Sequence, residues 1–183
     1  MKKILFIAMV LLSSVATYAQ QSKGTLTVQP KVGFNIATLT NADNGDSRFG
    51  LAAGAEFEYQ ATDLLSISFG AMYSMQGMKA SSDEGNATLK LDYVNIPILA
   101  NVYVVKGLAV KVGVQPGFMI DKDDAGDAVK TFDFSIPVGL SYEYANVVLD
   151  ARYNWGVTKV ADLGDNSPKN SVFQITLGYK FDL

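Results

Sequence analysis

Two pairs of charged residues could support chemistry in this sequence. Glu56 and Glu58 lie two residues apart, as do Asp150 and Arg152. Paired carboxylates can act as general acid and general base in hydrolysis. However, the chain contains no histidine and no cysteine, which removes the imidazole base, the thiolate nucleophile and the common zinc ligands. We therefore expect no catalytic residue, no cofactor and no metal site.

The charged residues fit better as partners for one another in an interior that excludes water. Five basic and five acidic residues occupy polar positions within otherwise apolar segments of the chain. Charges that leave water must be paired and hydrogen-bonded. We expect a structural network in which opposite charges satisfy one another: Lys31, Arg48, Lys111, Arg152 and Lys180 against Glu56, Glu58, Asp133, Glu143 and Asp150.

The composition excludes several classes of protein. A chain of 183 residues without cysteine is expected to form one domain without disulfides. Its net charge of -3 provides no basic surface for nucleic acid. Mean hydropathy is high at +0.15. Yet beyond the first residues no apolar run approaches the roughly 20 residues of a transmembrane helix.

The first residues have the features of a secretory signal peptide. Two lysines precede the apolar run Ile4–Leu12, and the small residues Thr17 and Ala19 follow it. A membrane anchor is disfavoured, because the run is short and no positively charged flank follows it. We expect residues 1–19 to be removed and residues 20–183 to form the exported domain.

The remainder of the chain alternates between apolar and polar residues with a period of two. In residues 26–36 the even positions are apolar and the odd positions are polar or glycine, which predicts a strand with one apolar face. Seven further segments repeat the pattern: 48–59, 65–76, 89–102, 108–120, 132–144, 147–156 and 173–181. In the fourth segment the parity of the apolar residues changes near Tyr93. We interpret this change as a bulge or as the point where the strand leaves a membrane.

The connections between these segments alternate in length. An antiparallel sandwich also alternates apolar and polar residues, so the pattern alone does not define the environment. The connections 38–47, 77–86, 121–130 and 157–170 are long and polar, whereas 60–63, 104–107 and 145–146 are short. Long loops at one end and tight turns at the other are typical of a transmembrane up-and-down β-barrel.

Aromatic residues collect near both ends of the predicted strands, as in the girdles of a membrane barrel. Those by the short turns are Tyr59, Tyr103, Tyr142, Tyr144, Tyr179 and Phe181, and those by the long loops are Phe49, Tyr73, Phe118, Phe132, Tyr153, Trp155 and Phe173. The polar faces are rich in Gly, Ser and Thr, which suits a crowded interior. We predict an all-β, closed antiparallel up-and-down transmembrane barrel of about eight strands, with its apolar face toward lipid and its first and last strands paired.

Five short motifs recur in an order that resembles a known family. They are Lys31-Val32-Gly33-Phe34-Asn35, Leu91–Ile98, Lys106-Gly107-Leu108, Ala151–Gly156 and Leu177–Phe181. Together they resemble the PorT-like outer-membrane β-barrel proteins of Bacteroidota, often called porin-family proteins, over essentially the whole exported domain. The chain departs from such barrels by ending on Asp182-Leu183 rather than on the aromatic residue that the assembly machinery reads.

The resemblance implies an outer-membrane location, contact with outer-membrane lipid, and insertion by the barrel assembly machinery. It assigns no catalytic residues. The word porin does not establish conduction, because eight strands enclose an interior that side chains can fill, whereas water-filled channels appear at about 16 strands. Our leading hypothesis is a monomeric, non-enzymatic structural component of the envelope or a platform for surface contacts.

Two alternatives remain open from the residues. One is a narrow pore for small solutes, since interior glycines and serines leave space. The other is a soluble exported barrel of the lipocalin kind that holds an apolar ligand. A surface ligand would bind through the long loops. The acidic stretch Asp121–Asp127 resembles a calcium loop but has Ala125 at a ligand position, so we interpret it as a solvated acidic loop.

Overall fold

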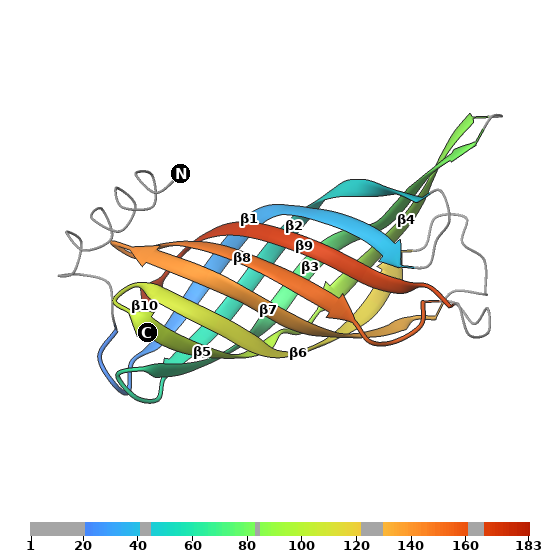
Figure 1. Cartoon of the computed structure of the whole chain (residues 1–183). Helices are drawn as coiled ribbons and strands as arrows, with labels where there is room; N and C mark the ends of the chain where they lie inside the picture. The colour runs from blue at the N-terminus through green and yellow to red at the C-terminus, as the bar shows by residue number, and fades with distance from the viewer. Residues whose placement is uncertain (1–20, 41–44, 83–84, 122–129, 161–166) are drawn as a thin grey trace, which may run out of the picture.

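The computed structural model describes residues 21–40, 45–82, 85–121, 130–160 and 167–183, and the predicted signal peptide lies outside these ranges. Figure 1 shows the chain winding as successive strands around one axis. In the described ranges, no helix is long and apolar enough to cross a membrane. The strands are β1 (Leu26–Thr40), β2 (Gly45–Gln60), β3 (Leu65–Ser82), β4 (Gly85–Asn95), β5 (Ile98–Val105), β6 (Leu108–Asp121), β7 (Phe132–Tyr144), β8 (Val147–Gly156), β9 (Lys169–Tyr179) and β10 (Phe181–Asp182).

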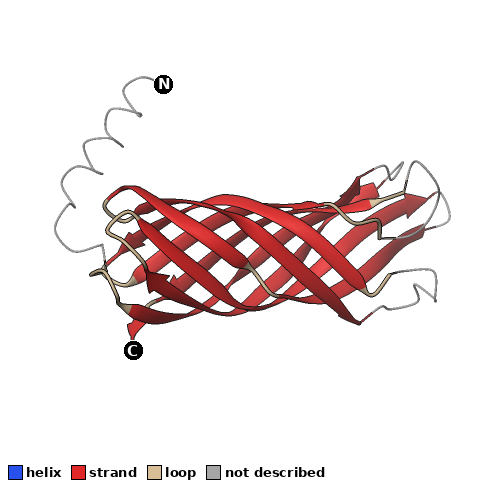
Figure 2. Cartoon of the chain, turned by 90° about the horizontal axis from the view of Figure 1, so that it is seen from below, coloured by secondary structure: helices blue, strands red, loops and turns tan. Residues whose placement is uncertain are grey.

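These segments form a closed antiparallel barrel of eight strands, as predicted (Figure 2). β4 and β5 are one wall strand interrupted at Ile96-Pro97, because proline lacks the amide hydrogen of a ladder bond. β9 and β10 are likewise one strand interrupted at Lys180. β1 pairs with β9 from Lys31↔Gly178 to Thr40↔Lys169, so the first and last strands close the wall.

The two faces of the wall differ in polarity as the alternation predicts. In β6, Val110, Val112 and Val114 are 37–45% exposed on the outer surface. Lys111 and Gln115, on the other face, are both 3% exposed and point into the barrel. The apolar face is therefore outside. A lipocalin-like barrel would line an internal cavity with that face, so this alternative is wrong.

Interior glycines allow neighbouring strands to approach closely. A Cβ atom at Gly33 would collide with the carbonyl oxygen of Ile175, and one at Gly113 would collide with that of Ile98. Any larger residue would push these strand pairs apart. The wall can therefore curve tightly around a narrow bore.

The structure departs from the sequence prediction at the long-loop end. The predicted loop 77–86 is mostly a hairpin, since β3 continues to Ser82 and β4 begins at Gly85 (Figure 1). A register shift lies near Tyr93, as predicted, but the extra residue is Ile120 on β6, between the partners of Asp92 and Tyr93. Tyr93 is buried and shares its parity with the buried Asn95, so the side chains of β4 do not change faces there.

Candidate functional site: the barrel interior

Five charged side chains meet across the bore in a group that we call the central cluster. Lys31 comes from β1, Glu56 from β2, Lys111 from β6, and Asp150 and Arg152 from β8. The Nζ atom of Lys31 lies 2.8 Å from Glu56 Oε2, and that of Lys111 lies 2.8 Å from Asp150 Oδ2. Arg152 joins the two carboxylates, with Nη2 2.8 Å from Glu56 Oε1 and Nε 2.8 Å from Asp150 Oδ1. Each of the five side chains is at most 3% exposed.

The central cluster holds three cations and two carboxylates, so each carboxylate is shared. Asp150 lies within 3.4 Å of Lys31 as well as close to Lys111 and Arg152. The planar guanidinium of Arg152 provides the fork that two carboxylates require. Because Glu56 on β2 reaches both Arg152 on β8 and Lys111 on β6, the contacts of the cluster cross the bore.

A second group of polar side chains, the turn-end cluster, lies nearer the short turns. The Nζ atom of Lys180 is 2.7 Å from Glu143 Oε2 and 3.1 Å from Glu58 Oε2. Tyr103 donates a hydrogen bond of 2.5 Å to Glu58 Oε1, and Ser66 donates one of 2.6 Å to the same oxygen. One cation faces two carboxylates here, which offsets the excess cation of the central cluster.

The predicted aromatic girdle is wrong at Tyr103. It is 5% exposed and its hydroxyl lies 3.2 Å from Lys180 Nζ, so it belongs to the interior. The signal was in the sequence, because Tyr103 has the parity of the inward-facing Asn101 rather than that of Val102. The other twelve predicted residues lie on the outer side: Phe49, Tyr59, Phe118, Phe132, Tyr144, Tyr153, Trp155, Phe173, Tyr179 and Phe181 are exposed, and Tyr73 and Tyr142 are half-buried.

The remaining two predicted network residues lie toward the long loops, away from both clusters. Arg48 Nη1 is 3.5 Å from Asp92 Oδ1, and Tyr73 donates a hydrogen bond of 2.5 Å to Asp92 Oδ2. Asp133 accepts a hydrogen bond of 2.8 Å from the hydroxyl of Thr158. Asp92 was missing from the predicted network, although its parity is opposite to that of the apolar Leu91 and Tyr93.

An apolar group, the outer cluster, occupies the interior at the long-loop end. It consists of Leu39, Leu91, Tyr93, Met119 and Val160, all of them buried. The sequence pattern counted Leu91 and Tyr93 with the apolar, outward-facing positions, and this prediction was wrong. The parity of Leu91 and Tyr93 is that of Asn95, and this was the available signal.

The carboxylates of the central cluster are occupied by ion pairs. Glu56 and Asp150 are each bound by cations, and neither carboxylate faces a nucleophile or an imidazole. Among the described residues, no group of three or more Asp or Glu side chains could hold a metal ion. Of the acidic stretch that resembles a calcium loop, only Asp121 is described.

Three solved structures resemble this fold. Ail of Yersinia pestis, in a phospholipid bilayer nanodisc, is 12% identical with a TM-score of 0.55, over 87% of this chain and 100% of that one. Neisserial surface protein A is 16% identical with a TM-score of 0.51, over 85% and 97%. OprG from Pseudomonas aeruginosa is 14% identical with a TM-score of 0.51, over 90% and 99%. At these identities the likeness shows the fold alone.

The sequence comparisons identify the family. Among curated proteins, none matches this chain. The model of a family described as outer membrane protein beta-barrel domain matches residues 18–162, well over half of the sequence. The apolar outer surface and the closed wall agree with a barrel that is surrounded by lipid. The chain is therefore an outer-membrane β-barrel protein and belongs to the outer membrane protein beta-barrel domain family.

Proposed function

We propose that this barrel is a non-enzymatic, monomeric component of the outer membrane that serves envelope structure or provides a platform for surface contacts. The observation that carries the proposal is the central cluster, in which ion pairs from Glu56 to Arg152 and Lys111 cross the bore. An enzyme of this size would need a reactive group facing substrate, and a channel would need an open path.

The contacts of the central cluster argue against free conduction. Glu56 bridges β2 to Lys31 on β1 and to Arg152 on β8. Opening a path would separate charges that lie 2.8 Å apart in an interior with little water. A narrow bore with such contacts favours a filled lumen over a pore.

The long-loop end supports a role in surface contacts. The hairpin of β3 and β4 extends beyond the rest of the wall at that end (Figure 1). Rigid scaffolds commonly carry binding functions on their connecting segments.

The proposal also covers the subfamily and the export of the protein. We propose that the protein is PorT-like, that residues 1–19 are a signal peptide, and that the barrel assembly machinery inserts the barrel into the membrane. Mass spectrometry of the protein from outer membranes should give a mature N-terminus at Gln20. A chain retaining residues 1–19 in the membrane would contradict this part of the proposal.

Planar-bilayer recording tests the filled lumen. We expect the purified protein to give no reproducible unit conductance. Variants Glu56→Gln and Arg152→Gln alter the central cluster, and Lys106→Gln changes an exposed charge at a short turn as the matched control. A unit conductance that changes with Glu56→Gln or Arg152→Gln but not with Lys106→Gln would overturn the proposal and favour a narrow pore.

A deletion strain tests the role in the cell. Envelope integrity, surface adhesion and secretion should be scored together, with the wild-type gene restored as the control. We expect a defect in integrity or adhesion that an Arg152→Gln variant with normal folding still complements. A strain without either defect would contradict the proposed role.

A further inference from the structure

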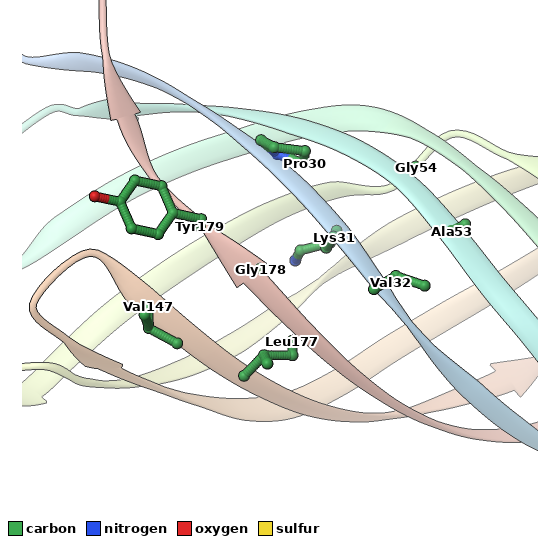
Figure 3. A pocket seen from close by; sticks show the side chains of 9 residues that line it. All are labelled: Pro30, Lys31, Val32, Ala53, Gly54, Val147, Leu177, Gly178 and Tyr179. Carbon is green, nitrogen blue, oxygen red and sulfur yellow. The ribbon is translucent and has the colours of Figure 1, made fainter.

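The outer surface of the barrel has an apolar hollow of about 540 Å³ near the short turns. Small-molecule pockets commonly measure about 300–1,000 Å³. Its lining comes from β1, β2, β8 and β9 and includes Pro30, Val32, Ala53, Val147, Leu177 and Tyr179 (Figure 3). The hollow therefore spans four adjacent strands of the wall.

The hollow lies on the seam where β1 meets the last strand. Lys31 pairs with Gly178, and Val28 pairs with Phe181 in the same register. The two intervening rungs, at Gln29 and Pro30, have no pairing partner in the described seam. Pro30 has no amide hydrogen to donate across it. The ladder of β1 and the last strand is therefore interrupted here, although the strands stay close: a Cβ atom at Gly178 would lie 3.0 Å from the carbonyl oxygen of Pro30.

The walls of the hollow are bulky and its floor is small. Val147, Leu177 and Tyr179 stand on one side, and Pro30 and Val32 on the other (Figure 3). Gly178 on β9 and Gly54 and Ala53 on β2, beyond Pro30 and Val32, contribute little or no side chain. A hydrocarbon chain lying here would touch protein on several sides, whereas a flat wall offers contacts on one side only.

The position of the hollow along the barrel indicates which kind of molecule would bind in it. It adjoins the tight turn at Ala145 and Asn146, and the rings of Tyr179 and Phe181 lie 4.8 Å apart at the same end. In outer-membrane barrels the short turns face the periplasm, and aromatic rings mark the membrane interface. The hollow is thus continuous with the lipid-contacting surface in the periplasmic leaflet.

We propose that this hollow is a binding site for one acyl chain of a periplasmic-leaflet phospholipid. The chain packs against Leu177 and Val32 across the interrupted seam, and the phenol of Tyr179 marks the level of the headgroup. This site is independent of whether the lumen conducts. A bilayer recording and a lipid-binding measurement can therefore fail separately.

Native mass spectrometry of the full-length protein tests the site. The protein is extracted with its membrane lipids, and detergent then removes lipid in steps. We expect one phospholipid to remain after bulk lipid is lost. Ala53→Phe, which fills the hollow, should reduce that retained fraction at least tenfold. Ala100→Phe adds the same ring on β5, on the far side of the barrel, and should retain the lipid.

Heat-dependent migration in gels verifies that each variant folds. If Ala53→Phe does not fold, Val32→Trp narrows the same hollow from β1. Wild-type protein that keeps no phospholipid would overturn the proposal. So would retention that is equal in folded hollow-filling variants and in Ala100→Phe, or a retained lipid that is solely an outer-leaflet glycolipid.

Discussion

The two ends of the barrel interior are stabilised by different forces. Toward the short turns, the central and turn-end clusters are held by charge-assisted contacts of 2.7–2.8 Å, such as Lys180 with Glu143 and Lys31 with Glu56. Toward the long loops, Leu39, Leu91 and Tyr93 pack as an apolar group. The same narrow bore is therefore filled by ion pairs at one end and by hydrocarbon at the other.

The two kinds of packing determine where the barrel tolerates substitution. A charge that loses its partner keeps its desolvation cost, whereas an apolar residue that loses atoms leaves only a cavity. The short-turn end should therefore be sensitive to charge balance, and the long-loop end to volume. A second substitution that restores the charge balance should recover stability at the short-turn end. No such compensation by charge is expected at the long-loop end.

The largest expected effect is at Asp150. Asp150→Asn leaves the three cations of the central cluster with one carboxylate, so the free energy of unfolding should fall by about 3–5 kcal/mol. Urea unfolding of the protein in lipid vesicles measures this change. Asp150→Asn combined with Lys111→Met leaves two cations with one carboxylate, which is the same excess of one positive charge as in the wild type, and should recover part of the loss. A single substitution that costs under about 1 kcal/mol would break the comparison.

A somewhat smaller loss is expected at Lys180. Lys180→Met removes the cation between Glu58 and Glu143, and the two carboxylates then face each other. We expect a loss of about 3 kcal/mol, because Tyr103 and Ser66 still donate to Glu58. The same unfolding assay should show partial recovery when Glu143→Gln is added. Equal stability of the single and double variants would show that charge balance does not govern this end.

At the long-loop end the expected loss is smaller still. Leu91→Ala leaves a cavity in the outer cluster and should cost about 2 kcal/mol, the low end of the range for buried leucines. Ile120→Ala, at an exposed position of the same end, is the control and should cost less. A loss at Leu91 as large as that at Asp150 would remove the distinction between the two ends.

Much of the wall follows from alternation alone. The period of two placed Lys111 inside and Val112 outside, and the need to satisfy backbone groups in lipid required β1 to pair with the last strand. The parity of Asp150 and Arg152 assigned them to the interior face. Which charges contact which others was not predictable, because those contacts depend on strand tilt and side-chain reach across the bore.

The errors also have physical causes. Tyr103 was assigned to the girdle by residue type, although its parity places it inside beside Lys180. The polar composition of residues 77–86 suggested a loop, yet backbone pairing between β3 and β4 continues to Ser82. The hollow at Pro30 was not predicted, because its lining comes from four strands that are distant in sequence.

The smallest expected effect tests whether the short-turn end is already optimised. Ala145 and Asn146 join β7 to β8 with φ values of 46° and 70°, the left-handed region that side chains disfavour. Ala145→Gly should relieve that strain, offset by greater freedom of the unfolded chain, for a net gain of about 0.5 kcal/mol. Asn146→Ala should instead destabilise, because the Asn146 side chain donates a hydrogen bond of 3.1 Å to the carbonyl oxygen of Lys180. If Ala145→Gly destabilised the barrel in vesicles, the strain at this turn would be smaller than the entropy cost of ordering a glycine. The rigidity of the short-turn end would then come from its ion pairs and not from the turn.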